Sequence, residues 1–121
     1  MESFGIKSPD APYFLPPYEW YNDSISAWTA AQGSILVNYT PGTLSHADYT
    51  LSSDKNYRNS ETIWNSIIKR EREGGLNGFI LLMHIGAGPG RKDPFYQELP
   101  RLLKWLKLKG YELVRVDEML K

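Results

Sequence analysis

The residue type best suited to chemistry is a histidine, His84, which ends a short apolar stretch. Residues 79–83 are all apolar, and glycines at positions 74, 75 and 78 mark a turn before them. A run this short and apolar predicts a strand buried on both faces, as in a parallel sheet. His84 would then lie at the strand's carboxyl end, where α/β sheets place catalytic groups. The alternative is a histidine that only completes the hydrogen bonding of the core.

A second group of candidates combines prolines with aromatic residues: Pro16, Pro17, Tyr18 and Trp20. Flat aromatic faces suit a sugar, because they stack on the C–H surface of a pyranose ring. These residues follow a predicted strand, so in a parallel sheet they would share one rim with His84. The alternative is that the aromatic residues only fix the start of the following helix.

Two other patterns are compatible with a bound ligand. The glycine-rich loop 86–90 lies between a predicted strand and a predicted helix, as a phosphate-binding loop would. Its spacing is not G-x-G-x-x-G, however, and Pro89 removes one backbone donor. His46, Asp48 and His84 carry metal-ligating groups, but no known ligand spacing relates them. Cysteine is absent, which excludes thiolate ligands and a cysteine nucleophile.

The composition indicates one small globular domain covering residues 1–121. Fourteen basic residues balance 14 acidic ones, so the charge gives no indication of nucleic-acid binding. No apolar run approaches the roughly 18 residues of a membrane span. The first residues lack the charged and apolar regions of a signal peptide, and the compartment stays open.

Four strands and three helices are expected to position these residues. Strands are predicted at 13–15, 34–39, 79–83 and 111–116, and a long polar connection at 40–59 is expected to be functional. The three helices would begin at Asn22 or Asp23, at Asn59 or Ser60, and at Asp93. Their expected buried faces are Ile25, Trp28 and Ala31; Ile63, Trp64, Ile67 and Ile68; and Phe95, Leu99, Leu102, Leu103 and Leu106. The order predicts an α/β fold with a mostly parallel sheet, although three helices would cover it only partly.

In this order, the residues resemble a known enzyme family. Residues 14–18 (FLPPY), 47–49 (ADY), 81–84 (LLMH) and 110–114 (GYELV) resemble the C-terminal half of polysaccharide deacetylases, the NodB-homology enzymes of carbohydrate esterase family four. The resemblance covers about residues 13–120. It implies half of a distorted (β/α) barrel.

The resemblance also implies roles for single residues. His84 would be the general acid that protonates the leaving group. Asp48 would survive as a structural or orienting carboxylate of the family site. Leu82 would line the acetyl pocket, and Pro16, Pro17 and Tyr18 would form a groove wall. The substrate would be an acetylated polysaccharide or oligosaccharide. The complete family site also contains a zinc-like divalent metal held by Asp-His-His, and the family is often extracytoplasmic.

Departures from the family pattern limit this expectation. Leu15 stands where the family has an arginine that orients the catalytic base, and Tyr49 where a tryptophan is common. The metal-binding and base motifs of the N-terminal half are absent from this sequence. We therefore expect no metal site and little hydrolysis from this chain alone, and we expect pairing with a second copy or with a separate N-terminal half. The alternative function is a non-catalytic carbohydrate-binding or interaction module.

Overall fold

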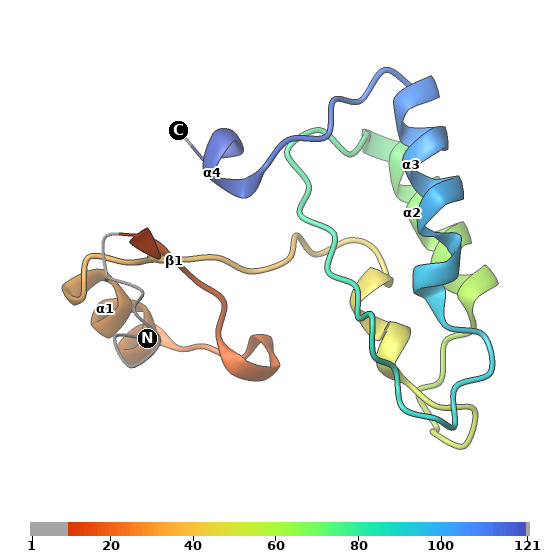
Figure 1. The fold of residues 1–121 in the computed structure, drawn as a ribbon, viewed down its shortest axis with the longest axis horizontal. Coiled ribbons are helices and arrows are strands. Elements are labelled where there is room, and N and C mark those ends of the chain that lie inside the picture. The colour runs from red at the N-terminus through yellow and green to blue at the C-terminus, as the bar shows by residue number, and fades with distance from the viewer. Residues whose placement is uncertain (1–9, 121) are drawn as a thin grey trace. The chain divides into compact units, whose positions relative to one another are not determined.

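The structure, a computed structural model, describes residues 10–120. It divides into two compact units, one ending at Tyr39 and the other beginning at Thr40 (Figure 1). The predicted mixture of helices and strands is confirmed, but the only sheet among the described residues is a parallel pair of strands. The half-barrel and the single domain over residues 1–121 stay predictions.

The first unit is built on a short β-α-β connection. Strand β1 (Tyr13–Phe14) pairs in parallel with β2 (Ile35–Leu36), and α1 (Asp23–Ala31) lies between them in the sequence. Asn22 caps α1, because its Oδ1 accepts a hydrogen bond from the Ile25 N–H at 2.9 Å. Gly33 turns the chain after the helix with a φ of 71°. The strands are shorter than the predicted 13–15 and 34–39.

The expected buried face of α1 is wrong. Trp28 is 68% exposed, and Thr29 is the only buried residue of the helix. A sheet of two strands offers too little surface to cover an amphipathic helix. The spacing of the apolar residues therefore predicted the helix correctly but not its burial.

The second unit contains the main core. Helices α2 (Ser60–Gly74) and α3 (Leu99–Leu108) lie side by side (Figure 1), and α3 follows a 3₁₀ helix, η5 (Phe95–Glu98). Asn59 caps α2, with its Oδ1 2.7 Å from the Thr62 N–H. The third helix was expected to begin at Asp93. Instead η5 begins at Phe95, after Pro94 and without a side-chain cap, and α3 continues directly from it at Leu99. The core residues are Ile63, Trp64, Ile67, Leu76, Phe95, Leu102 and Leu106.

The two strands predicted in the second unit do not form. Residues 79–85 and 111–115 belong to no sheet, and α4 (Val116–Met119) occupies the end of the second stretch. Residues 79–84 are only partly buried, contrary to the expectation of burial on both faces. Among residues 10–120, the only backbone pairing of residues 79–85 outside their own turn is the Thr40 N–H donated to the Ile80 carbonyl. An apolar run indicates that a segment can enter a sheet, but a strand also needs neighbours to pair with.

The helices of the described part of the chain include none long and apolar enough to cross a membrane.

Candidate active site around His84 and Asp48

One carboxylate contacts His84 at two positions. Asp48 Oδ2 accepts a hydrogen bond from the His84 backbone N–H at 2.6 Å, and Asp48 Oδ1 lies 2.6 Å from His84 Nδ1. Asp48 is 1% exposed, whereas the His84 side chain is 34% exposed. The backbone contact places the histidine, and the side-chain contact fixes the orientation of its ring. A buried carboxylate and an accessible imidazole therefore form one unit.

The long connection 40–59 positions Asp48. Part of it forms a 3₁₀ helix, η4 (Ser45–Tyr49), in which Ser45, Ala47 and Asp48 are buried. The start of η4 is attached to α2, because the Leu44 N–H donates to Ser66 Oγ at 2.9 Å. The end of η4 is closed by the Thr50 hydroxyl, which donates to the Ala47 carbonyl at 2.7 Å. Much of the expected irregular loop is thus an ordered support for one carboxylate.

The contact leaves one nitrogen of the imidazole available. With Nδ1–H donated to Asp48, only Nε2 remains to exchange a proton, and no described residue hydrogen-bonds to it. The half-exposed Tyr49 ring packs edge-on against the imidazole, with ring centroids 5.6 Å apart. A carboxylate-oriented imidazole with one accessible nitrogen can act as a general acid or base.

The residues around His84 do not fit a metal ion. Among residues 10–120, no group of three or more His, Asp or Glu side chains could hold one. Both oxygens of Asp48 are occupied by hydrogen bonds to His84. His46, the only other histidine, lies partly buried in η4 and belongs to no such group. The described residues around His84 therefore provide an acid–base group but no set of metal ligands.

The structure brings Asp48 and His84 together. Leu82 lies two residues before His84 on the same extended segment and is partly buried. The four predicted sugar-contacting residues belong to the first unit. Pro16 is buried and Pro17 is exposed, whereas Tyr18 is 94% and Trp20 65% exposed.

The loop that carries these aromatic residues has an unusual backbone. Pro17, Tyr18 and Glu19 form a 3₁₀ turn in which Tyr18 and Glu19 have left-handed φ values of 57° and 56°. Left-handed backbone is costly for residues other than glycine. The amide of Asn38 holds the turn, because its Nδ2 donates to the Glu19 carbonyl at 2.8 Å. The fold thus holds an exposed tyrosine on a strained but supported turn.

An acidic residue expected to cap the third helix interacts elsewhere. The Asp93 carboxylate accepts hydrogen bonds from the Tyr57 hydroxyl at 2.7 Å and from the Ser60 N–H, at the start of α2, at 2.6 Å. Burial raises the pKa of Asp93, but these hydrogen bonds and the charge of Arg91 outweigh it and leave the pKa below its usual range. The hydrogen bond to Asp93, followed by burial, raises the pKa of Tyr57.

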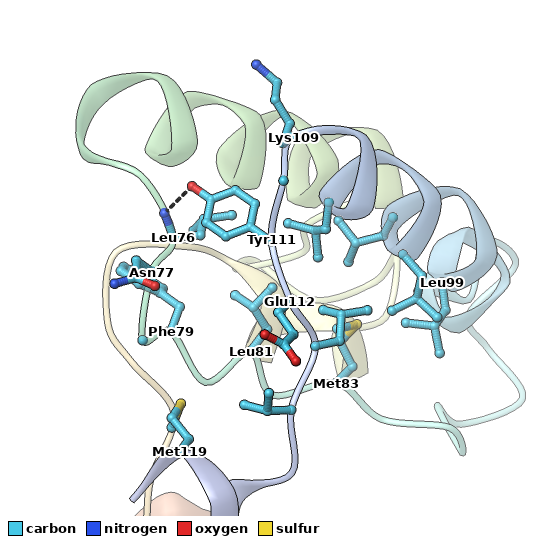
Figure 2. A pocket seen from close by; sticks show the side chains of 17 residues that line it. Leu76, Asn77, Phe79, Leu81, Met83, Leu99, Lys109, Tyr111, Glu112 and Met119 are labelled. Carbon is cyan, nitrogen blue, oxygen red and sulfur yellow. Dashed lines mark hydrogen bonds between the residues drawn. The ribbon is translucent and has the colours of Figure 1, made fainter.

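A large apolar groove borders the two extended segments of the second unit. Its volume is about 930 Å³, and it is lined by residues 76–79, by Leu81 and Met83, by leucines of α3, by residues 109–114 and by Met119. Figure 2 shows Tyr111 at one end, where its hydroxyl accepts a hydrogen bond from the Leu76 N–H at 2.8 Å. Leu81 and Met83 line the same groove. This groove could not be predicted from the sequence, because apolar residues at 79–83 and on α3 would equally pack against each other in a complete α/β layer.

Comparison of the chain with protein-family models, with curated proteins and with solved structures finds no match.

Proposed function

We propose that this chain is the acid-histidine part of a polysaccharide deacetylase-like carbohydrate esterase. In this proposal His84 protonates the leaving group as an acetyl group is removed from a sugar, and Asp48 orients the imidazole. Leu82 would line the acetyl pocket, and Pro16, Pro17, Tyr18 and Trp20 would contact the sugar.

The observation that carries this proposal is the double contact of Asp48 with His84. A histidine that serves only as a core residue has no need of an ordered carboxylate that fixes its ring while one side stays accessible. Here the carboxylate is buried, the imidazole is 34% exposed, and Nε2 remains for a substrate. An oriented imidazole supplies a proton at a defined position, which is what a general acid requires.

The metal and the catalytic base of the complete family site would have to come from another polypeptide. Two unpaired extended segments of the second unit support such a partner. Residues 81–83 and 112–114 make no backbone hydrogen bond to any described residue. Leu113 and Val114 are nearly half exposed beside the apolar groove. Extended backbone with unpaired N–H and C=O groups favours the addition of a strand from another chain.

Sedimentation velocity over a hundredfold concentration range would test this part of the proposal. Self-association that weakens in Val114→Pro, which removes a backbone donor, would identify a second copy as the partner. A chain that stays monomeric would point to a separate N-terminal half instead. Retention of the self-association in Val114→Pro would exclude this edge as the contact.

A titration with an acetylated chitooligosaccharide would test the role of His84. We expect the imidazole NMR signals of His84 to shift on binding, because the leaving group must approach Nε2. We expect no deacetylation by this chain alone, with or without added zinc. Deacetylation by the isolated chain would contradict the proposal that it carries only half of the active site. Binding of the oligosaccharide without a shift of the His84 imidazole signals would contradict the role of His84 as the acid.

The exposed aromatic turn favours a second candidate, a carbohydrate-binding module without catalysis. Tyr18 at 94% and Trp20 at 65% exposure present stacking surfaces that the core of the unit does not need. In this case Trp20→Ala would abolish binding of the oligosaccharide, whereas His84→Ala would not. The deacetylase proposal expects both substitutions to weaken binding. Trp28→Ala, which removes another exposed tryptophan, is the matched control.

A further inference from the structure

A buried arginine, Arg91, is connected to the candidate site through hydrogen bonds to the backbone. Arg91 follows the glycine-rich loop after His84, and its side chain is 0% exposed. Complete burial of a guanidinium group is costly unless its donors are satisfied. Its nearest carboxylate, that of Asp93, lies 3.8 Å from Nε, so carbonyl groups rather than an ion pair provide the closest contacts.

The guanidinium group joins three separate pieces of backbone. Nη1 donates to the Thr50 carbonyl at 2.7 Å, Nη2 to the Arg58 carbonyl at 3.0 Å, and Nε to the Asp93 carbonyl at 3.0 Å. Nη2 also lies 3.3 Å from Ser60 Oγ. Thr50 and Arg58 are the two ends of a polar loop, and Ser60 begins α2. One side chain therefore closes this loop and fastens it to the start of the helix.

The hydrogen bonds of Arg91 are connected to Asp48 through Thr50. The Thr50 carbonyl is held by Arg91, while the Thr50 hydroxyl accepts from the Arg58 N–H at 3.1 Å and donates to the Ala47 carbonyl at 2.7 Å. Ala47 immediately precedes Asp48 in η4. A displacement at Thr50 would shift the last turn of η4 and with it the carboxylate that contacts His84.

We infer that Arg91 is a positioning residue for the candidate site. By holding Thr50, it fixes η4 so that Asp48 reaches both the backbone N–H and Nδ1 of His84. Lysine cannot replace it, because an ammonium group has no planar fork with which to span three carbonyls. A catalytic effect of Arg91 rests on the proposed function. The effect of Arg91 on the position of Asp48 does not.

Amide hydrogen exchange measured by NMR tests the inference directly. The His84 N–H is protected by Asp48, so its exchange reports the position of the carboxylate without any substrate. The amide of Ile67, a fully buried residue of α2, reports the stability of the whole unit. In Arg91→Met and Arg91→Lys we expect the protection of His84 to fall about tenfold more than that of Ile67. Arg115→Met, which alters an exposed arginine, should change neither.

Equal losses at His84 and Ile67 would overturn the inference, because Arg91 would then only stabilise the unit. Unchanged protection at His84 would overturn it as well. If the Arg91 variants do not fold, Thr50→Val tests the step from Thr50 to η4. It removes the hydroxyl bonds to the Ala47 carbonyl and to the Arg58 N–H, and it leaves Arg91 and the bond from the Thr50 N–H to the Ala47 carbonyl in place. We expect Thr50→Val to lower the protection of His84 selectively, and an unselective effect would exclude this path to Asp48. Exchange needs no turnover, so a failed glycan titration leaves these outcomes unaffected.

Discussion

Two helices of this chain each carry a tryptophan on the face expected to be buried, and the two side chains end in opposite environments. Trp64 in α2 is 9% exposed, whereas Trp28 in α1 is 68% exposed. The Trp64 ring lies 6.1 Å from that of Trp105 and 4.0 Å from the Arg101 guanidinium carbon. Helix α2 packs against α3, whereas among residues 10–39 the only sheet available to α1 is a pair of two-residue strands.

The difference shows what an amphipathic pattern does and does not specify. The spacing of apolar residues selects the helix and the side of it that can be buried. Burial itself requires a second apolar surface, which the neighbouring elements must supply. In the second unit α3 supplies this surface to α2, whereas in the first unit Trp28 stays exposed to solvent.

The largest expected effect tests this comparison with one substitution in each helix. Trp64→Ala should destabilise the second unit by about 3–5 kcal/mol, because it removes a large side chain from the core. Trp28→Ala should change stability by less than about 0.5 kcal/mol, as at other exposed positions. Urea unfolding followed by circular dichroism would measure both. Similar losses in the two variants would show that Trp28 is covered in solution.

A smaller effect is expected when the carboxylate that contacts His84 is removed. Asp48→Ala leaves the His84 N–H without its acceptor and should cost about 1–3 kcal/mol in the second unit. Asp54→Ala is the matched control, because Asp54 accepts only an exposed hydrogen bond, from the Leu51 N–H at 2.8 Å. The same urea titration measures the free energy of unfolding of both variants. If Asp48→Ala leaves the free energy of unfolding unchanged, the contact with His84 contributes nothing to the stability of the fold.

Acid should weaken the second unit partly through Asp93. Its pKa is lower in the folded chain than in the unfolded one, so its contribution to stability is present above the unfolded value. That contribution is lost as the pH falls below about 4 towards the folded value. Asp93→Asn should therefore reduce the difference in unfolding temperature between pH 6 and pH 3. Tyr57→Phe, which removes one hydrogen bond to this carboxylate, should reduce it by a smaller amount.

The smallest expected effect lies in the first unit. Tyr18→Gly should stabilise this unit by about 1 kcal/mol, because glycine adopts the left-handed backbone at no steric cost. The same substitution should weaken glycan binding if the exposed ring stacks on sugar. Hydrogen exchange in β1 and β2 would measure the gain. Destabilisation instead would indicate that the tyrosine side chain holds the turn.

Features that depend on residues close together in the sequence could be predicted. The start of α2 at Asn59 or Ser60 and the helical spacing of Ile63 and Ile67 could be predicted, because each depends on nearby residues. The prediction of a strand at 79–83 was wrong, because a strand forms only if segments far along the chain lie beside it and pair with it.

The candidate site was predictable only in part for the same reason. The family resemblance singled out His84 and Asp48 separately and did not pair them, whereas the structure has them in contact. Arg91 was missed, because an arginine between glycine and lysine in a loop carries no sign of burial. Its role depends on three carbonyls that the fold brings together.

The contact between Asp48 and His84 also links binding to folding. It joins residues 36 positions apart and closes a loop that contains the whole of α2. A ligand that favours the ordered arrangement of His84 would therefore shift the folding equilibrium of the second unit as well. A sugar that binds there should raise the unfolding temperature of α2, although it need not touch that helix.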